Sequence, residues 1–245
     1  MSTIIAVVSG KGGTVKTSFS AGVGLALSEL GYHTLCLDCD ITLRNLDMAL
    51  GLSDRAVMDF SDVIHGRCSL EDAVVSPVRY PRLALLAAPL CDGELDVSEE
   101  QMQHLARLIR SQYDYCLVDG PAGLGQGFRL ATAIADRVVV VTTTESPALR
   151  DAQRTVMTLS RFGTGKMHLV VNRVDKRLMR ELRATIDDAM DTAGLPLLGV
   201  VPEDKDIPYA LHRGIPLRDC NYFAQRAYDN IAKRIVGRSI PLMKL

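Results

Sequence analysis

Short runs of consecutive hydrophobic residues alternate with longer segments of mixed polarity along this chain. The runs are rich in Val, Ile and Leu, which is typical of strands buried on both faces. We predict strands at residues 3 to 9, 34 to 38, 83 to 88, 115 to 119, 137 to 143, 168 to 172 and 197 to 201. Apolar positions with helical spacing predict helices at residues 16 to 30, 98 to 111, 147 to 161 and 177 to 193.

This alternation predicts an α/β fold, a doubly wound and mostly parallel sheet with helices on both faces. Ligands of such folds bind at the carboxyl ends of the strands. A chain of 245 residues that is 47% hydrophobic can bury one large core, and we find no repeat or linker in it. Residues 1 to 245 are therefore expected to form a single domain.

Charge and the amino terminus narrow the class of protein. The formal net charge is −1, from 28 basic and 29 acidic side chains, which provides no general attraction for nucleic acid or an anionic membrane. Without a strongly basic patch that carries aromatic residues, we predict no specific nucleic-acid partner. The opening MSTIIAVVSG lacks a basic leader, which indicates a cytoplasmic protein.

The cysteines are scattered, as buried thiols of a reducing compartment usually are. Cys36 and Cys39 form a C-x-x-C at the end of a predicted strand, where positions i and i+3 point to opposite faces. This argues against a metal or a disulfide at the pair. The other cysteines are Cys68, Cys91, Cys116 and Cys220.

The stretch SGKGGTVKTS, residues 9 to 18, follows the first predicted strand and begins a helix. It fits the phosphate-loop pattern G-x-x-x-x-G-K-[ST] except at Val15, where the pattern has glycine. Its glycines let backbone N–H groups turn toward phosphate oxygens. Lys16 would neutralise the β and γ phosphates, and the Thr17 hydroxyl would ligate Mg²⁺. The alternative is a glycine-rich turn without a ligand.

Acidic residues end two other predicted strands. Asp38 and Asp40 lie in LDCDITLRNLD, where two carboxylates can act on Mg²⁺ or on an attacking water. Asp119 lies in YCLVDGPAG, at the position of an acid that holds Mg²⁺ through its water shell. A solvated acidic turn is the alternative for the first pair. The phosphate loop and the two acidic segments thus follow three predicted strands, and all three indicate the same chemistry, phosphate transfer.

These segments carry a family resemblance that runs from residue 3 to about residue 242. The chain resembles the MinD branch of the MinD/ParA (deviant Walker A) ATPases, which regulate the bacterial division site. The motifs that carry the resemblance are KGGTVKT, DCDITLRNLDMALGL, DGPAGLGQGF, TTTESPALRDAQR, VVNRV and GVVPEDKDIP.

The resemblance implies binding and hydrolysis of ATP with Mg²⁺ and a homodimer that forms with ATP. It implies that Lys11 reaches the partner subunit's nucleotide and that Asp40 helps to position the hydrolytic water, with Lys16 at the phosphates. The metal residues are Thr17, Asp38 and Asp119. The implied nucleotide-binding residues are Gly10, Lys11, Gly12, Gly13, Thr14, Val15, Lys16, Thr17 and Ser18 in the loop, and Asn172, Pro202, Glu203 and Asp204 beside the adenine.

The resemblance also implies a surface for MinC/MinE-like division regulators, on the helix that carries Arg150, Asp151 and Arg154. From the residues alone, the alternative interpretation is that these three side chains form a solvated helix face and that Asn172 is a polar residue at a strand end. No guanine-reading N-K-x-D motif occurs in the chain, so an adenine nucleotide is expected.

Val15 departs from the family pattern at the point where the backbone passes the β phosphate. If this position needs a positive φ, valine strains the loop by about 1–3 kcal/mol. A loss of that size weakens ATP binding about 5- to 150-fold. Two hypotheses follow: an ATP-driven switch with a weakened loop, or a non-catalytic interaction module that keeps only the fold and the partner surface.

The carboxyl terminus is a second departure. Members of this branch continue into a short amphipathic helix that inserts into the membrane, whereas this sequence ends at IPLMKL. We therefore expect weak, salt-sensitive binding to liposomes, although the family implies a peripheral location at the inner face of the cell membrane. A stripe with helical spacing precedes this tail and is expected to face the core. It consists of Ala224, Ala227, Tyr228, Ile231 and Ile235.

Two related classes remain as alternatives. Iron–sulfur carriers and nitrogenase-type reductases need paired cysteines at a dimer interface, and neither CLDC on its strand nor the isolated Cys220 provides them. ParA-type partitioning ATPases are closer, and salt-sensitive binding to random duplex DNA would be their sign.

Overall fold

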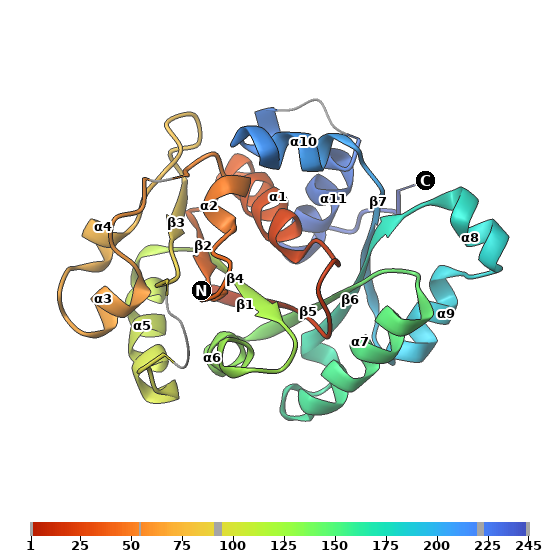
Figure 1. Ribbon diagram of the computed structural model, residues 1–245, viewed down its shortest axis with the longest axis horizontal. Helices are drawn as coiled ribbons and strands as arrows, with labels where there is room; N and C mark the ends of the chain where they lie inside the picture. The colour runs from red at the N-terminus through yellow and green to blue at the C-terminus, as the bar shows by residue number, and fades with distance from the viewer. Residues whose placement is uncertain (1, 54, 91–94, 220–222, 244–245) are drawn as a thin grey trace.

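The computed structural model describes residues 2–53, 55–90, 95–219 and 223–243. Within them the strands form one seven-stranded parallel sheet with the order β3-β2-β4-β1-β5-β6-β7 (Figure 1). The strands are β1 (Thr3–Ser9), β2 (Thr34–Asp38), β3 (Leu83–Leu86), β4 (Tyr115–Ala122), β5 (Arg137–Thr142), β6 (Met167–Val174) and β7 (Leu197–Pro202). Each predicted strand is present, and β4 and β6 are longer than predicted.

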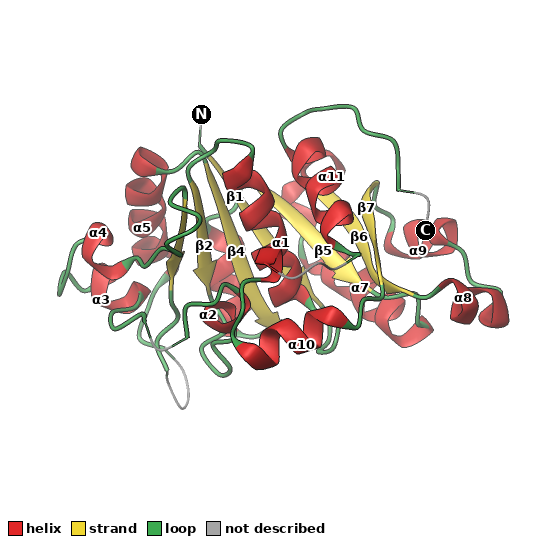
Figure 2. Ribbon diagram, turned by 90° about the horizontal axis from the view of Figure 1, so that it is seen from above, coloured by secondary structure: helices red, strands yellow, loops and turns green. Residues whose placement is uncertain are grey.

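Helices cover both faces of this sheet: Figure 1 shows the strands between the two helical layers, and Figure 2 looks onto the layer that contains α1 and α11. Helices α1, α2, α10 and α11 share one hydrophobic cluster with the sheet, whereas α5, α6, α7 and α9 pack in two clusters on the opposite face. The doubly wound α/β prediction is confirmed. The helices are α1 (Lys16–Glu29), α2 (Leu46–Ala49), α3 (Phe60–Ile64), α4 (Leu70–Ala73), α5 (Glu99–Gln112), α6 (Gln126–Ala133), α7 (Ser146–Thr158), α8 (Lys176–Leu182), α9 (Ile186–Ala193), α10 (Asp206–Arg213) and α11 (Gln225–Ile235).

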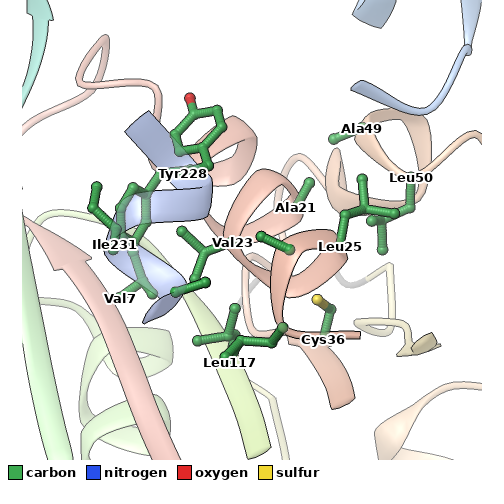
Figure 3. Close-up of a cluster of buried hydrophobic side chains, with 14 of the residues drawn as sticks. Val7, Ala21, Val23, Leu25, Cys36, Ala49, Leu50, Leu117, Tyr228 and Ile231 are labelled. Atoms are coloured by element: carbon green, nitrogen blue, oxygen red, sulfur yellow. The ribbon is translucent and has the colours of Figure 1, made fainter. Parts of the chain in front are cut away.

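Helix α1, which begins in the phosphate loop, is buried on all sides between the sheet and α11. Its small residues allow this close packing, and Figure 3 shows Tyr228 of α11 on one side of α1 and Cys36 of β2 on the other. A Cβ atom on Gly22 would lie 2.4 Å from a ring carbon of Tyr228, and one on Gly24 would lie 2.5 Å from the sulfur of Cys36. The glycines thus set the position of α1, and with it the position of the loop.

We expect Gly22→Ala to destabilise the protein, because overpacking against the buried Tyr228 ring costs about 1–3 kcal/mol. This outweighs the gain of about 1 kcal/mol in helix propensity. The net loss should lower the melting temperature by about 2–8 °C in thermal unfolding followed by circular dichroism. Gly165→Ala is the control, because a Cβ there meets no atom within 4 Å. An unchanged melting temperature for Gly22→Ala would show that α11 can move away from the added methyl group without loss of stability.

The helix predicted at residues 177 to 193 is wrong in one respect, because the segment forms two helices. Arg183 takes a left-handed backbone with φ 51° and ends α8. Thr185 then caps α9, since its hydroxyl accepts a hydrogen bond from the Asp188 N–H and the Asp188 carboxylate accepts one from the Thr185 N–H. This reciprocal cap starts a new helix and outweighs the continuous periodicity of the segment.

The packing confirms the predictions for the C-x-x-C pair and for the stripe near the carboxyl terminus. Cys36 lies in the cluster under α1 and Cys39 in a cluster on the opposite face, so their predicted opposite directions are confirmed. The stripe predicted from Ala224 to Ile235 is buried against the sheet and α1, also as predicted. Cys91 and Cys220 lie outside the described residues. Over the described residues, no helix has the length and apolar character required to cross a membrane.

Candidate functional site

The predicted phosphate loop connects the carboxyl end of β1 to α1, and its Val15 lines one cavity together with Met48 of α2 and Leu211 of α10. The loop leaves β1 after Ser9 and enters α1 at Lys16. Asp119 of β4 pairs in register with Val7 of β1 on one side and with Asp38 of β2 on the other. Parallel pairing therefore brings two carboxylates and the loop lysine together.

Asp119 is the centre of this arrangement. Its two carboxylate oxygens accept hydrogen bonds from the Thr17 hydroxyl at 2.7 Å and from the Ser20 hydroxyl at 2.8 Å. Burial raises the pKa of Asp119, although Lys16 and the two hydroxyls act in the opposite direction. The first turns of α1 are thus fixed to β4, three residues before the end of that strand.

Asp38 is buried beside Asp119. Its oxygens accept from the N–H groups of Asp40 at 2.8 Å and Leu46 at 3.3 Å. Burial, followed by the charge of Asp119, raises the pKa of Asp38 well above its ordinary value. Two neighbouring buried carboxylates favour a cation between or beside them, because both cannot easily stay charged without one.

Lys16 is the cation that the chain itself supplies. Its side chain is buried, which lowers its pKa, while the charges of Asp119 and Asp40 act in the opposite direction. Asp40 is half-buried, and one of its oxygens accepts from the Thr42 hydroxyl and from the N–H groups of Thr42 and Leu43. A buried lysine near carboxylates suits an anionic ligand that brings its own metal ion.

Oxygen donors at the site suit Mg²⁺, which prefers carboxylate, hydroxyl, phosphate and water oxygens. Thr17, Asp38 and Asp119 supply a hydroxyl and two carboxylates. In addition, the hydroxyls of Thr14 and Ser18 are buried and have no hydrogen-bond partner in the part of the chain that is described. Buried polar atoms without partners are rare, and these two fit a phosphate ligand of the loop.

Val15 adopts a left-handed backbone with φ 59° and ψ 42°. A positive φ is unusual for a β-branched residue and costs about 1–3 kcal/mol. The condition under which valine strains the loop is therefore met. The half-buried side chain of Val15 packs at the margin of the cluster that contains α1 and α11.

A cavity of about 280 Å³ adjoins the loop, and Gly13 and Val15 form part of its wall. Asn172 is buried there and donates its side-chain amide to the carbonyl of Thr14 at 2.9 Å. The structure thus brings together the residues for which adenine contact was expected. The cavity is lined by Gly13, Val15, Asn172, Arg173, Pro202, Glu203, Asp204, Ile207, Pro208 and Leu211.

Lys11 contacts its own subunit at the start of α7. Its ammonium lies 3.3 Å from a carboxylate oxygen of Glu145, the residue that precedes α7. The loop also touches this helix directly, since a Cβ on Gly10 would lie 2.4 Å from the carbonyl oxygen of Asp151. The expected partner surface on α7 is therefore continuous with the beginning of the loop. On that surface Arg150 and Arg154 are exposed and Asp151 is half-buried.

Sequence reasoning missed several residues that the fold adds to the site. Ser20 supports Asp119, and Glu145 holds Lys11. Arg173 has φ 54°, pairs with Glu203 at 2.8 Å and donates to the carbonyl of Gly13 at 3.3 Å. Its position next to Asn172 was the available signal, whereas nothing in the sequence pairs Glu145 with Lys11.

Comparison with known proteins places these features in a family. Residues 5–217 match the model of the CobQ/CobB/MinD/ParA nucleotide binding domain. The chain is 37% identical over 246 residues to the septum site-determining protein MinD of Synechocystis, covering 99% of this chain and 92% of that protein. It is 38% identical over 249 residues to MinD of Bacillus subtilis, covering 100% of this chain and 93% of that protein.

Solved structures agree with the sequence comparison. One chain of a MinC:MinD cell division protein complex from Aquifex aeolicus superposes with a TM-score of 0.90 at 35% identity, over 99% of both chains. MinD of Pyrococcus horikoshii, solved with Mg-ADP, superposes with a TM-score of 0.81 at 28% identity, over 97% of both chains.

Proposed function

We propose that this chain, which belongs to the CobQ/CobB/MinD/ParA nucleotide-binding family and within it to the MinD branch, is an ATPase that regulates placement of the division site. It binds ATP with Mg²⁺, forms a homodimer in the ATP-bound state and acts through partner proteins. The observation that carries the proposal is the convergence of Lys16, Thr17, Asp38 and Asp119 at one strand edge, directly below a glycine-rich loop.

The phosphates of ATP would lie on the N–H groups of the loop and at the amino end of α1, whose dipole favours negative charge. Lys16 neutralises the β and γ phosphates, and the free hydroxyls of Thr14 and Ser18 donate to phosphate oxygens. Thr17, Asp38 and Asp119 hold Mg²⁺, directly or through water. The metal supplies charge neutralisation at the transferred phosphoryl group.

The adenine would occupy the cavity beside Asn172. Pro202 and Glu203 line this cavity from the end of β7, and Ile207 and Pro208 line it from α10. Asn172 is the residue there whose amide can face the base, although it donates to the loop carbonyl of Thr14 in this structure. Base recognition therefore requires Asn172 to exchange or share that contact.

Hydrolysis would use Asp40 to position the attacking water beside the γ phosphate. Lys11 would leave Glu145 and cross to the nucleotide of the partner subunit, which couples dimerisation to ATP. The ion pair is exposed, so breaking it costs about 1 kcal/mol or less. Contacts to the partner subunit's phosphates readily replace it.

Partner binding is proposed for the exposed side of α7. Arg150 and Arg154 point to solvent there, and Asp151 lies between them in the sequence. The complex of MinC with MinD from Aquifex aeolicus supports a MinC-like partner. We extend the proposal to a MinE-like regulator on the same helix.

Val15 weakens the loop. Its left-handed backbone is strained, and its side chain would add bulk where the β phosphate passes. This observation also favours the second candidate function, a MinD-like interaction module that binds partners without turning over ATP. Binding measurements separate the two, since the module does not bind ATP at millimolar concentration.

We expect the chain to bind ATP in preference to GTP. The adenine-side cavity presents the Asn172 amide, and the chain contains no exact N-K-x-D motif, because Arg173 stands in the place of the lysine. Competition against a fluorescent ATP analogue, with Mg²⁺ present, measures the preference in the parent chain and in Val15→Gly. GTP that competes as well as ATP would contradict the adenine assignment and, with it, this form of the proposed function.

A further inference from the structure

A second cavity lies on the other side of Val15. It has a volume of about 300 Å³ and contacts the amino end of α1, the loop before α2, and α10. Ser18, whose buried hydroxyl has no partner among the described residues, is part of its wall. The cavity is lined by Val15, Thr17, Ser18, Asn45, Met48 and Leu211.

Val15 and Leu211 are the two described residues that line both cavities. Together they form an apolar partition, which we call the Val15/Leu211 partition. Each cavity has a volume near the lower limit for a small-molecule site, about 300 Å³. A nucleotide has to contact the base-side residues around Asn172 and also the phosphate-side residues at the start of α1. Neither cavity alone provides both.

Helix α10 holds Leu211 in this position. Ile207 and Ala210 of α10 are buried in the core. Asp204 fixes the start of the helix, because its carboxylate accepts from the N–H of Asp206 at 3.0 Å and from that of Ala224 at 2.8 Å. Leu211 lies in the last turn, before Gly214 ends the helix with φ 60°. The partition therefore involves a well-anchored helix as well as the strained loop.

We infer that Leu211 is a positioning residue for the nucleotide, which with Val15 closes the passage between the cavity beside Asn172 and the cavity beside Thr17 and Ser18. The inference rests on the proposed function and deepens it. In the parent chain, Leu211 and Val15 together obstruct ATP. When residue 15 is glycine the passage is open, and Leu211 becomes an apolar wall that packs against the bound nucleotide.

The effects of the two residues on MgATP affinity should therefore be coupled. Truncation of Leu211 should raise this affinity when residue 15 is valine and lower it when residue 15 is glycine. In the parent chain, Leu211→Ala opens the partition and should tighten MgATP binding about 5-fold or more. In the Val15→Gly background, the same truncation removes an apolar contact and should weaken binding about 2- to 5-fold. A residue with only a structural role would change affinity in the same direction in both backgrounds.

The experiment measures the dissociation constant of MgATP by calorimetry for the parent, Leu211→Ala, Val15→Gly and the double variant. Leu211→Met keeps the side-chain volume and should retain the parent affinity, whereas Leu211→Val should give a smaller effect in the direction of alanine. Leu178→Ala is the matched control, because Leu178 is exposed on α8 and lines neither cavity. Thermal unfolding of each variant reports whether it is folded.

The outcomes separate the two proposals. If Val15→Gly binds MgATP but Leu211→Ala has no effect, or the same direction of effect in both backgrounds, the partition is overturned and the proposed function stands. If no variant binds MgATP at millimolar concentration, the proposed function and the partition are both overturned. A change of sign supports the inference.

Discussion

Val15→Gly should bind MgATP about 5- to 150-fold more tightly than the parent chain, and Lys16→Ala in that background should abolish the binding. The first effect comes from relief of the crowding near the β phosphate, and removal of the left-handed strain at φ 59° should in addition stabilise the folded loop. The other parts of the loop remain available, namely the glycines, Lys16, Thr17 and the free hydroxyls of Thr14 and Ser18. The loop therefore differs from the phosphate-loop pattern only in the side chain of Val15.

The loss expected from Lys16→Ala is larger, because Lys16 is buried beside two carboxylates. In the proposed complex Lys16 pairs with the phosphates, and removing one partner of such a buried charge pair costs about 2–5 kcal/mol, which corresponds to about 30- to 5,000-fold in affinity. Calorimetry measures both changes in affinity, and Lys166→Ala is the control because Lys166 is exposed in the short 3-10 helix Thr164–Lys166. Retained micromolar affinity in Val15→Gly/Lys16→Ala would show that the ligand does not lie in this loop.

Asp40→Asn, introduced into Val15→Gly, should lower the rate of ATP hydrolysis about 10²- to 10⁴-fold, the usual contribution of a positioned acid or base. Asparagine keeps an oxygen that can accept from the N–H groups of Thr42 and Leu43, so the turn after β2 should persist. ATP affinity should change only a few-fold, because the proposed contact of Asp40 is with water.

Phosphate release under saturating MgATP measures this rate, with calorimetry for the affinity. Asp187→Asn is a control for the loss of a surface carboxylate, since Asp187 is exposed at the start of α9. A rate equal to that of the Val15→Gly background would assign Asp40 to capping the turn alone.

Much of the fold was predictable from local pattern. The strands have continuous apolar runs because both faces of the sheet are covered, and the buried helix α1 follows directly from the first of them. The break between α8 and α9 was not predictable from periodicity, because Arg183 adopts a left-handed backbone without being glycine. Asp188 of the reciprocal cap was a local signal that the periodicity obscured.

Some residues of the candidate site could also be predicted from the sequence, and others could not. Lys16, Thr17, Asp38 and Asp119 were accessible to sequence reasoning, because the first two lie in the loop pattern and the other two lie at the end of predicted strands. Lys11 with Glu145 and Val15 with Leu211 are separated by long stretches of chain, and they meet only through the packing of α7 and α10 on the loop edge. Contacts of this kind require the tertiary structure.

The central claim is that the chain is an ATP-driven dimeric switch whose loop is restrained by Val15. Light scattering coupled to size exclusion tests it most directly, on Val15→Gly with and without saturating MgATP under conditions that limit hydrolysis. The account predicts a mass near 26.7 kDa without nucleotide and about twice that value with MgATP. It also predicts that Lys11→Ala in the same background binds MgATP but remains monomeric. A Val15→Gly chain that is saturated with MgATP and still monomeric would contradict the account.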